Sequence, residues 1–198
     1  MEGGWSLLIR MLKVGIICED PSDYDAISQL VRRVSKKDRM SFEKFAPKGC
    51  AKMMNKMSSY AETLSVKRCT ALIVVHDMDR NSKENLIRSI TSKIQGCSIR
   101  KKLICIPVEE LEAWFLSDMT NIKNVFSLQK KPKDIPNPEN VNSPKEHLEK
   151  IVKSHSDKRK VSLSTLVNKK IAENVDLDLI RKKCPSFNDF YEFTSVLN

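Results

Sequence analysis

Short apolar runs alternate with longer amphipathic segments along the first 118 residues of the chain. The apolar runs are rich in β-branched residues and have the length of buried parallel strands. We predict these strands at 12–18, 40–45, 70–76 and 102–108. Apolar positions at helical spacing predict helices between them, the first capped by Ser22 and the others at 50–64 and 83–95. A short amphipathic helix at 109–116 follows the last strand. Such alternation predicts an α/β fold with a mostly parallel sheet and helices on both faces.

The pattern changes after residue 128. The segment 129–144 holds four of the chain's eight prolines and no hydrophobic periodicity, which is typical of a connecting loop. Helical patterns then return at 145–154, 161–172 and 186–196. We therefore predict three parts: an N-terminal extension (1–10), an α/β core (11–128), and a Pro/Lys-rich loop with a basic helical extension of the same domain (129–198).

The charge balance favours a polyanionic partner. The 198 residues include 35 Lys and Arg against 25 Asp and Glu, a formal charge of +10. The segment 130–170 carries eleven Lys and Arg against five Asp and Glu. We expect its lysines and arginines to contact nucleic acid as a group, although a solvated basic face explains any single one of them better. The candidates are Lys158, Arg159, Lys160, Lys169 and Lys170.

Cysteine spacing and hydropathy indicate in which cellular compartment the protein resides. The six cysteines are scattered, and no Cys-x-x-Cys pair or Cys/His cluster has the spacing of a structural zinc site. Free thiols inside apolar runs are typical of a reducing compartment. No apolar run approaches the ~20 residues that a transmembrane helix needs. These features predict a cytoplasmic protein with no membrane segment.

Acidic residues follow three of the predicted strands. Glu19 comes after the first strand, Asp77 and Asp79 after the third, and Glu109, Glu110 and Glu112 after the fourth. The carboxyl ends of parallel strands meet at one edge of a sheet, and clustered carboxylates repel one another unless a cation lies between them. Their hard oxygen atoms predict one or two Mg²⁺ or Mn²⁺ ions. The alternative is that single acids only cap helices, and we consider Asp23 and Asp118 the best cases.

Two of these motifs resemble those of Toprim domains. Glu19-Asp20-Pro21-Ser22-Asp23 resembles the acidic turn of that family, and Asp77-Met78-Asp79 resembles its Asp-x-Asp motif. The segments 107–118, 143–145 and 175–187 resemble those of small stand-alone bacterial Toprim-like proteins of unknown function, so the resemblance covers about 11–197. One departure is clear: the family has glycine where this chain has Asp20, which places full activity in doubt.

The resemblance implies a Toprim-like, Rossmann-like core and a metal-dependent nuclease acting on DNA or RNA. By position, Glu19, Asp77, Asp79 and Glu112 would bind the metal and act in catalysis, with Asp118 as a further metal ligand. Related stand-alone proteins, similar to the Toprim domains of overcoming-lysogenisation-defect nucleases, imply a partner ATPase of the ABC or SMC type, a function in defence against phage, and a possible homo-oligomer.

Two rival interpretations stay open at this point. The chain could be a Toprim-like module that binds nucleic acid or a partner protein without cutting. It could also be a signalling domain of the response-receiver type, which clusters acids at strand ends in the same way. A receiver needs a lysine after a late strand, and the sequence does not show one clearly. Metal-dependent turnover separates the nuclease from the binding module.

Overall fold

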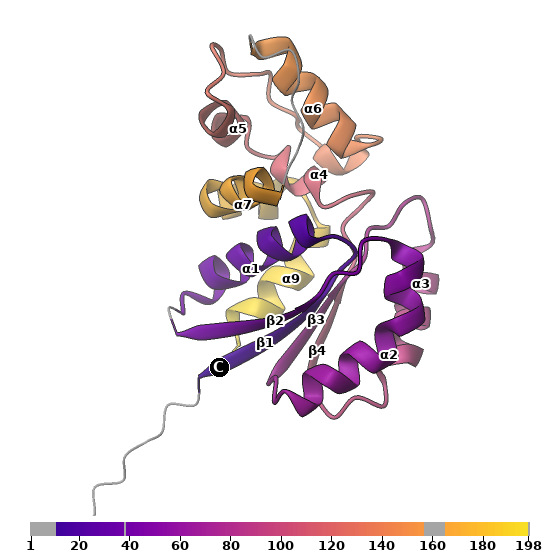
Figure 1. Cartoon of the computed structure of the whole chain (residues 1–198). Coiled ribbons are helices and arrows are strands. Elements are labelled where there is room, and N and C mark those ends of the chain that lie inside the picture. Colours follow the sequence, from indigo (N-terminus) through magenta and orange to yellow (C-terminus); the bar gives the residue numbers. More distant parts are fainter. Residues whose placement is uncertain (1–10, 38, 157–164, 198) are drawn as a thin grey trace, which may run out of the picture.

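Four short strands form the centre of the protein. The computed structural model describes residues 11–37, 39–156 and 165–197. All strand pairs are parallel, and the strand order is β2-β1-β3-β4 (Figure 1). The strands are β1 (Leu12–Ile17), β2 (Met40–Phe45), β3 (Ala71–Val75) and β4 (Lys101–Cys105). The predicted α/β fold with a parallel sheet is confirmed.

Helices cover both faces of this sheet. In Figure 1, α1 (Pro21–Ser35) and α9 (Ser186–Ser195) lie on one face, and α2 (Cys50–Val66) and α3 (Lys83–Ile94) lie on the other. Alternate side chains of a strand point to opposite faces. Val14, Ile16 and Ile73 accordingly belong to one buried cluster, whereas Leu72 and Val74 belong to the other. The protein is therefore a Rossmann-like three-layer fold.

Gly15 lets α2 approach the middle of the sheet. A Cβ atom built at this position would lie 2.8 Å from Leu64 Cδ1, closer than side-chain atoms normally approach. Leu64 is fully buried on α2, in the cluster that also contains Met53 and Met57. These methionines are core residues at helical spacing.

The order of strands and helices creates a switch point between β1 and β3. These strands are neighbours in the sheet, with Ile16 opposite Ile73. The chain leaves β1 toward α1 on one face and leaves β3 toward α3 on the other (Figure 1). Their connecting loops therefore diverge at the carboxyl end of the sheet, where doubly wound α/β proteins commonly bind ligands.

The first helix is capped differently from the prediction. Asp20, not Ser22, is the N-cap: its side chain accepts a hydrogen bond from the Ser22 backbone N–H at 2.9 Å, and Pro21 is the first helical residue. The Asp20 backbone is extended, with φ −123° and ψ 149°. This conformation does not require glycine, so the departure from the Toprim turn has a structural reason: Asp20 caps α1.

The C-terminal helices pack into the same core as α1 and the sheet. They are α4 (Glu112–Phe115), α5 (Met119–Phe126), the 3-10 helix η1 (Pro138–Asn140), α6 (Pro144–His155), α7 (Thr165–Asn174) and α8 (Leu177–Lys183). Helix α7 lies along α1, and Trp114 packs against Phe187 and Phe190. Within the described ranges, no helix is both long and apolar enough to cross a bilayer.

Candidate functional site

Backbone hydrogen bonds hold together the loops that follow the strands. The Lys48 and Gly49 N–H groups donate to the Glu19 carbonyl at 2.9 and 3.4 Å, which joins the end of β1 to the start of α2. The Asp79 N–H donates to the Glu109 carbonyl at 3.3 Å, which joins the loop after β3 to that after β4. The backbone thus fixes the acidic segments next to one another at the switch point.

Asp77 lies at the centre of the acidic group. Its Oδ1 accepts a hydrogen bond from the Leu111 N–H at 3.1 Å, which orients the carboxylate toward the turn after β4. Burial raises the pKa of Asp77 well above its ordinary value, and the nearby carboxylates of Asp23 and Glu112 raise it further. Asp77 therefore shares its surroundings with acids from α1 and α4.

Asp23 is both part of the capping structure of α1 and part of this acidic group. Its Oδ2 accepts the Asp20 N–H at 3.1 Å, completing a capping box. Burial raises the pKa of Asp23 to about 7, with Glu112 as the next largest cause. A simple solvated cap would not be perturbed in this way. Asp23 is thus not the N-cap but the N3 partner of the capping box, and the charges of Glu112, Asp20 and Glu19 also act on it.

Glu112 supplies the most buried carboxylate of the group. Glu112 is 5% exposed, and its Oε1 accepts a hydrogen bond from Asn168 Nδ2 at 3.2 Å. Burial raises the pKa of Glu112. Asn168 is itself 1% exposed, and its Oδ1 has no hydrogen-bond partner within the described part of the chain. An unpaired buried amide oxygen beside a carboxylate is unusual and marks a polar site.

Lys145 brings a positive charge to these carboxylates. It is the second residue of α6, and its backbone N–H donates to Glu110 Oε2 at 2.8 Å. Burial lowers the pKa of Lys145, but the carboxylates of Glu112, Asp23 and Glu110 outweigh that effect and leave the pKa raised. The ammonium group therefore offsets part of the repulsion among the acids.

Glu19 and Asp79 lie on the outer side of the acidic group, near Cys50. Burial raises the pKa of Cys50, and the charges of Glu19, Asp79 and Asp77 raise it further. Asp79 is exposed and has a left-handed backbone with φ 46°. It also lines a hollow of about 220 Å³ with Arg80, Glu109, Glu110 and Ser143. The site is thus open on this side.

We define the acidic cluster by its six carboxylates: Glu19, Asp23, Asp77, Asp79, Glu110 and Glu112. The cluster fits a hard metal ion better in the chemical type of its donor atoms than in their positions. Its donors are carboxylate oxygens, which Mg²⁺ and Mn²⁺ prefer. As the side chains are placed, however, no three His, Cys, Asp or Glu residues of the described ranges are arranged to hold one ion. A shared ion would require side-chain rotation, which is open to exposed Asp79.

Asp118 lies outside this cluster. Its Oδ1 accepts the Asn121 N–H at 2.9 Å as the N-cap of α5, and its Oδ2 accepts the Asp176 N–H at 3.0 Å. Both oxygens of the carboxylate are therefore committed to backbone donors. Asp118 borders a different hollow of about 650 Å³ between α5 and α7, which Lys170 also lines.

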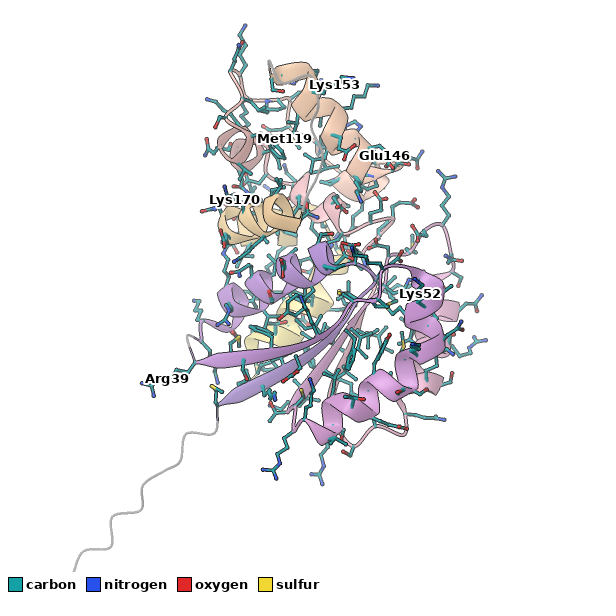
Figure 2. The ribbon with its side chains drawn as sticks, viewed as in Figure 1. Arg39, Lys52, Met119, Glu146, Lys153 and Lys170 are labelled. Atoms are coloured by element: carbon teal, nitrogen blue, oxygen red, sulfur yellow. The ribbon has the colours of Figure 1, made fainter. Side chains whose placement is uncertain are left out.

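The predicted basic contacts are only partly described. Lys158, Arg159 and Lys160 lie outside the described residues. Lys170 is exposed on α7 (Figure 2), and Lys169 forms an ion pair with Glu173 at 3.9 Å. Asn168 on the same helix faces Glu112, so Lys170, two residues and about 200° further round, faces away from the acidic cluster.

The structure thus gathers Glu19, Asp77, Asp79 and Glu112 at one edge of the sheet and adds residues that the sequence did not indicate. Asn168 and Lys145 come from the C-terminal helices. Asn168 lies in no motif, and Lys145 belongs to the segment 143–145 of the resemblance, which gave it no role in the site. For Asp23, the sequence did offer a signal: it lies four residues after Glu19, in the same acidic turn.

Comparison with known proteins gives a family without an assigned activity. A family model for a domain of unknown function, DUF4276, matches residues 6–193 of the chain. No curated protein and no solved structure matches it. The resemblance to Toprim domains remains a prediction from the motifs.

Proposed function

The chain belongs to the DUF4276 family, and from its own residues we propose that it is a divalent-metal-dependent phosphodiesterase that cleaves nucleic acid. One observation carries this proposal: Asp23, Asp77 and Glu112 are grouped at the switch point with raised pKa values. Carboxylates grouped in this way repel one another in the metal-free protein, and a bound cation would relieve that repulsion. The Toprim resemblance supports the same assignment for Glu19 and Asp79.

The residues would divide the chemistry among them. Glu19, Asp77, Asp79 and Glu112, with Asp23 added, would hold Mg²⁺ or Mn²⁺, which when bound polarises a phosphate and lowers the pKa of water. The Lys145 ammonium group would contact a phosphate oxygen. The pKa of about 7 for Asp23 applies to the metal-free protein; a bound cation would lower it and keep the carboxylate charged.

The partners and compartment belong to the proposal as well. The formal charge of +10 supports nucleic acid as the polyanion. The six free cysteines support the cytoplasm, where thiols stay reduced. An ATPase of the ABC or SMC type, a function in phage defence and a homo-oligomer rest on the Toprim resemblance.

The test is cleavage by the purified full chain. Plasmid, single-stranded DNA and tRNA are incubated with Mg²⁺, Mn²⁺ or EDTA, with and without a neighbouring ATPase. We expect metal-dependent cleavage that Asp77→Asn and Glu19→Gln each reduce at least 100-fold. Asp178→Asn is the matched control, because its side chain is 91% exposed on α8 and should leave cleavage unchanged. Equal cleavage by all four proteins would refute the assignment.

One observation favours the binding module as a second candidate. No three ligands of the described ranges are arranged around one point, which suits a site that binds without a catalytic metal. If the wild type cleaves none of the substrates with any metal or with the ATPase, but binds one of them in a gel-shift assay, the module replaces the enzyme.

A further inference from the structure

Cys50 and His76 form a sulfur and nitrogen pair beside the acidic cluster. Cys50 Sγ lies 3.2 Å from His76 Nε2. Cys50 is the first residue of α2, and His76 directly follows β3. The other five cysteines are buried, whereas Cys50 is partly exposed. The proposed phosphodiester chemistry uses neither side chain of this pair.

A second hydrogen bond fixes the tautomer of the imidazole. His76 Nδ1 lies 2.6 Å from the Asp77 carbonyl oxygen, which can only accept, so Nδ1 carries the proton. In the neutral ring, Nε2 then directs its lone pair toward the Cys50 thiol. A histidine whose Nδ1–H donates to a backbone carbonyl while Nε2 stays free is the arrangement found at metal sites. Because His76 is 3% exposed, its ring is held in this orientation.

The spacing of the pair is close to that of two ligands on one zinc ion. Bond lengths of about 2.3 Å to sulfur and about 2.0 Å to nitrogen, at a tetrahedral angle, place the two ligand atoms roughly 3.5 Å apart. Cys50 Sγ and His76 Nε2 need to separate by only a few tenths of an ångström from 3.2 Å. With the ring fixed, the Cys50 side chain must also rotate, so that Sγ moves off the line of the Nε2 lone pair that the ion then occupies.

The charges around the pair favour a cation. Glu19, Asp79 and Asp77 are the groups whose negative charge acts on the Cys50 thiol. The same negative potential that disfavours a bare thiolate attracts a divalent ion. Asp79 is exposed on its turn, so its carboxylate is free to rotate and supply an oxygen ligand.

We propose that Cys50 and His76 are the sulfur and nitrogen ligands of a thiophilic transition-metal site that takes Zn²⁺, with the Asp79 carboxylate rotating in as the third ligand. On binding, the Cys50 thiol releases its proton to solvent and the thiolate bonds to the ion. This site shares Asp79 with the acidic cluster, but its sulfur and nitrogen ligands set it apart from the all-oxygen ligands proposed for Mg²⁺. It does not rest on phosphodiester cleavage.

The experiment uses Co²⁺ as a spectroscopic substitute for Zn²⁺ on the full chain. Cobalt bound to a thiolate gives a near-ultraviolet charge-transfer absorption, whereas cobalt on carboxylates alone does not. We expect the wild type to bind one Co²⁺ per chain with this absorption. Zn²⁺ should displace the cobalt, and excess Mg²⁺ should not. Cys50→Ser should abolish it, His76→Gln should weaken cobalt binding at least tenfold, and Asp79→Asn should weaken it severalfold.

Cys69→Ala is the matched control. Cys69 is also a free thiol, but it precedes β3 at the opposite end of that strand from His76. We expect it to keep the full absorption, with thermal melting showing that each variant is folded. A wild type without thiolate absorption, or an absorption that survives in a folded Cys50→Ser variant, would overturn the proposal. Since Asp79→Asn changes an exposed residue, it tests the site even if the buried His76→Gln variant fails to fold.

Discussion

Replacing Asp23 with asparagine should stabilise the metal-free protein, and the gain should depend on pH. The carboxylate titrates near 3.8 in an unfolded chain and near 7 in the folded protein. Between these values the folded state binds more protons than the unfolded state, so wild-type stability falls as pH rises through this window. Asparagine carries no charge to bury, so the variant escapes that loss.

The magnitude follows from the size of the pKa change. A rise of about three pKa units at ~1.4 kcal/mol per unit gives an upper limit of about 4 kcal/mol above pH 7. Because Asp23 is partly exposed, we expect about 2 to 3 kcal/mol. The capping box should survive, since the asparagine carbonyl can still accept the Asp20 N–H. Glu112 and Asp77 should then ionise more readily.

The assay is urea unfolding in EDTA at several pH values from 4 to 8, comparing wild type with Asp23→Asn. We expect no difference near pH 4 and a growing advantage for the variant up to pH 8. Asp25→Asn is the matched control, because Asp25 lies on the same helix but is not among the charges that act on Asp77 or Glu112. A constant difference across pH, or a less stable variant at pH 8, would refute the electrostatic reasoning.

Three other substitutions test the packing around the site by urea unfolding. Asp118→Ala should cost about 2 to 3 kcal/mol, because it leaves two backbone N–H groups without their acceptor; a change below 0.5 kcal/mol would contradict this. Gly15→Ala should cost about 1 to 3 kcal/mol through its clash with Leu64, and an unchanged midpoint would show that α2 shifts freely. Trp114→Phe should cost about 1 to 3 kcal/mol because Ser186 Oγ loses its donor, and an unchanged midpoint would contradict this.

The strands were predictable because their signal is local. The strand Met40–Phe45 was placed at its exact bounds, and the other three within a few residues. Two helices were missed, α5 and α8, which have eight and seven residues. Helices this short show barely two turns of periodicity, and their aspartate caps, Asp118 and Asp176, are the clearer signal.

The acidic cluster was predictable only in the part that depends on strand order. Glu19, Asp77 and Asp79 follow from the rule that the carboxyl ends of parallel strands share an edge. Asn168 reaches Glu112 because α7 packs along α1, and Lys145 reaches the cluster because the N-terminus of α6 is fixed to Glu110. Neither contact has a local pattern. The C-terminal helices therefore do more than cover the core. They supply the Asn168 amide and the Lys145 ammonium group, which partly compensate the buried carboxylates. The cluster thus depends on residues from both ends of the chain.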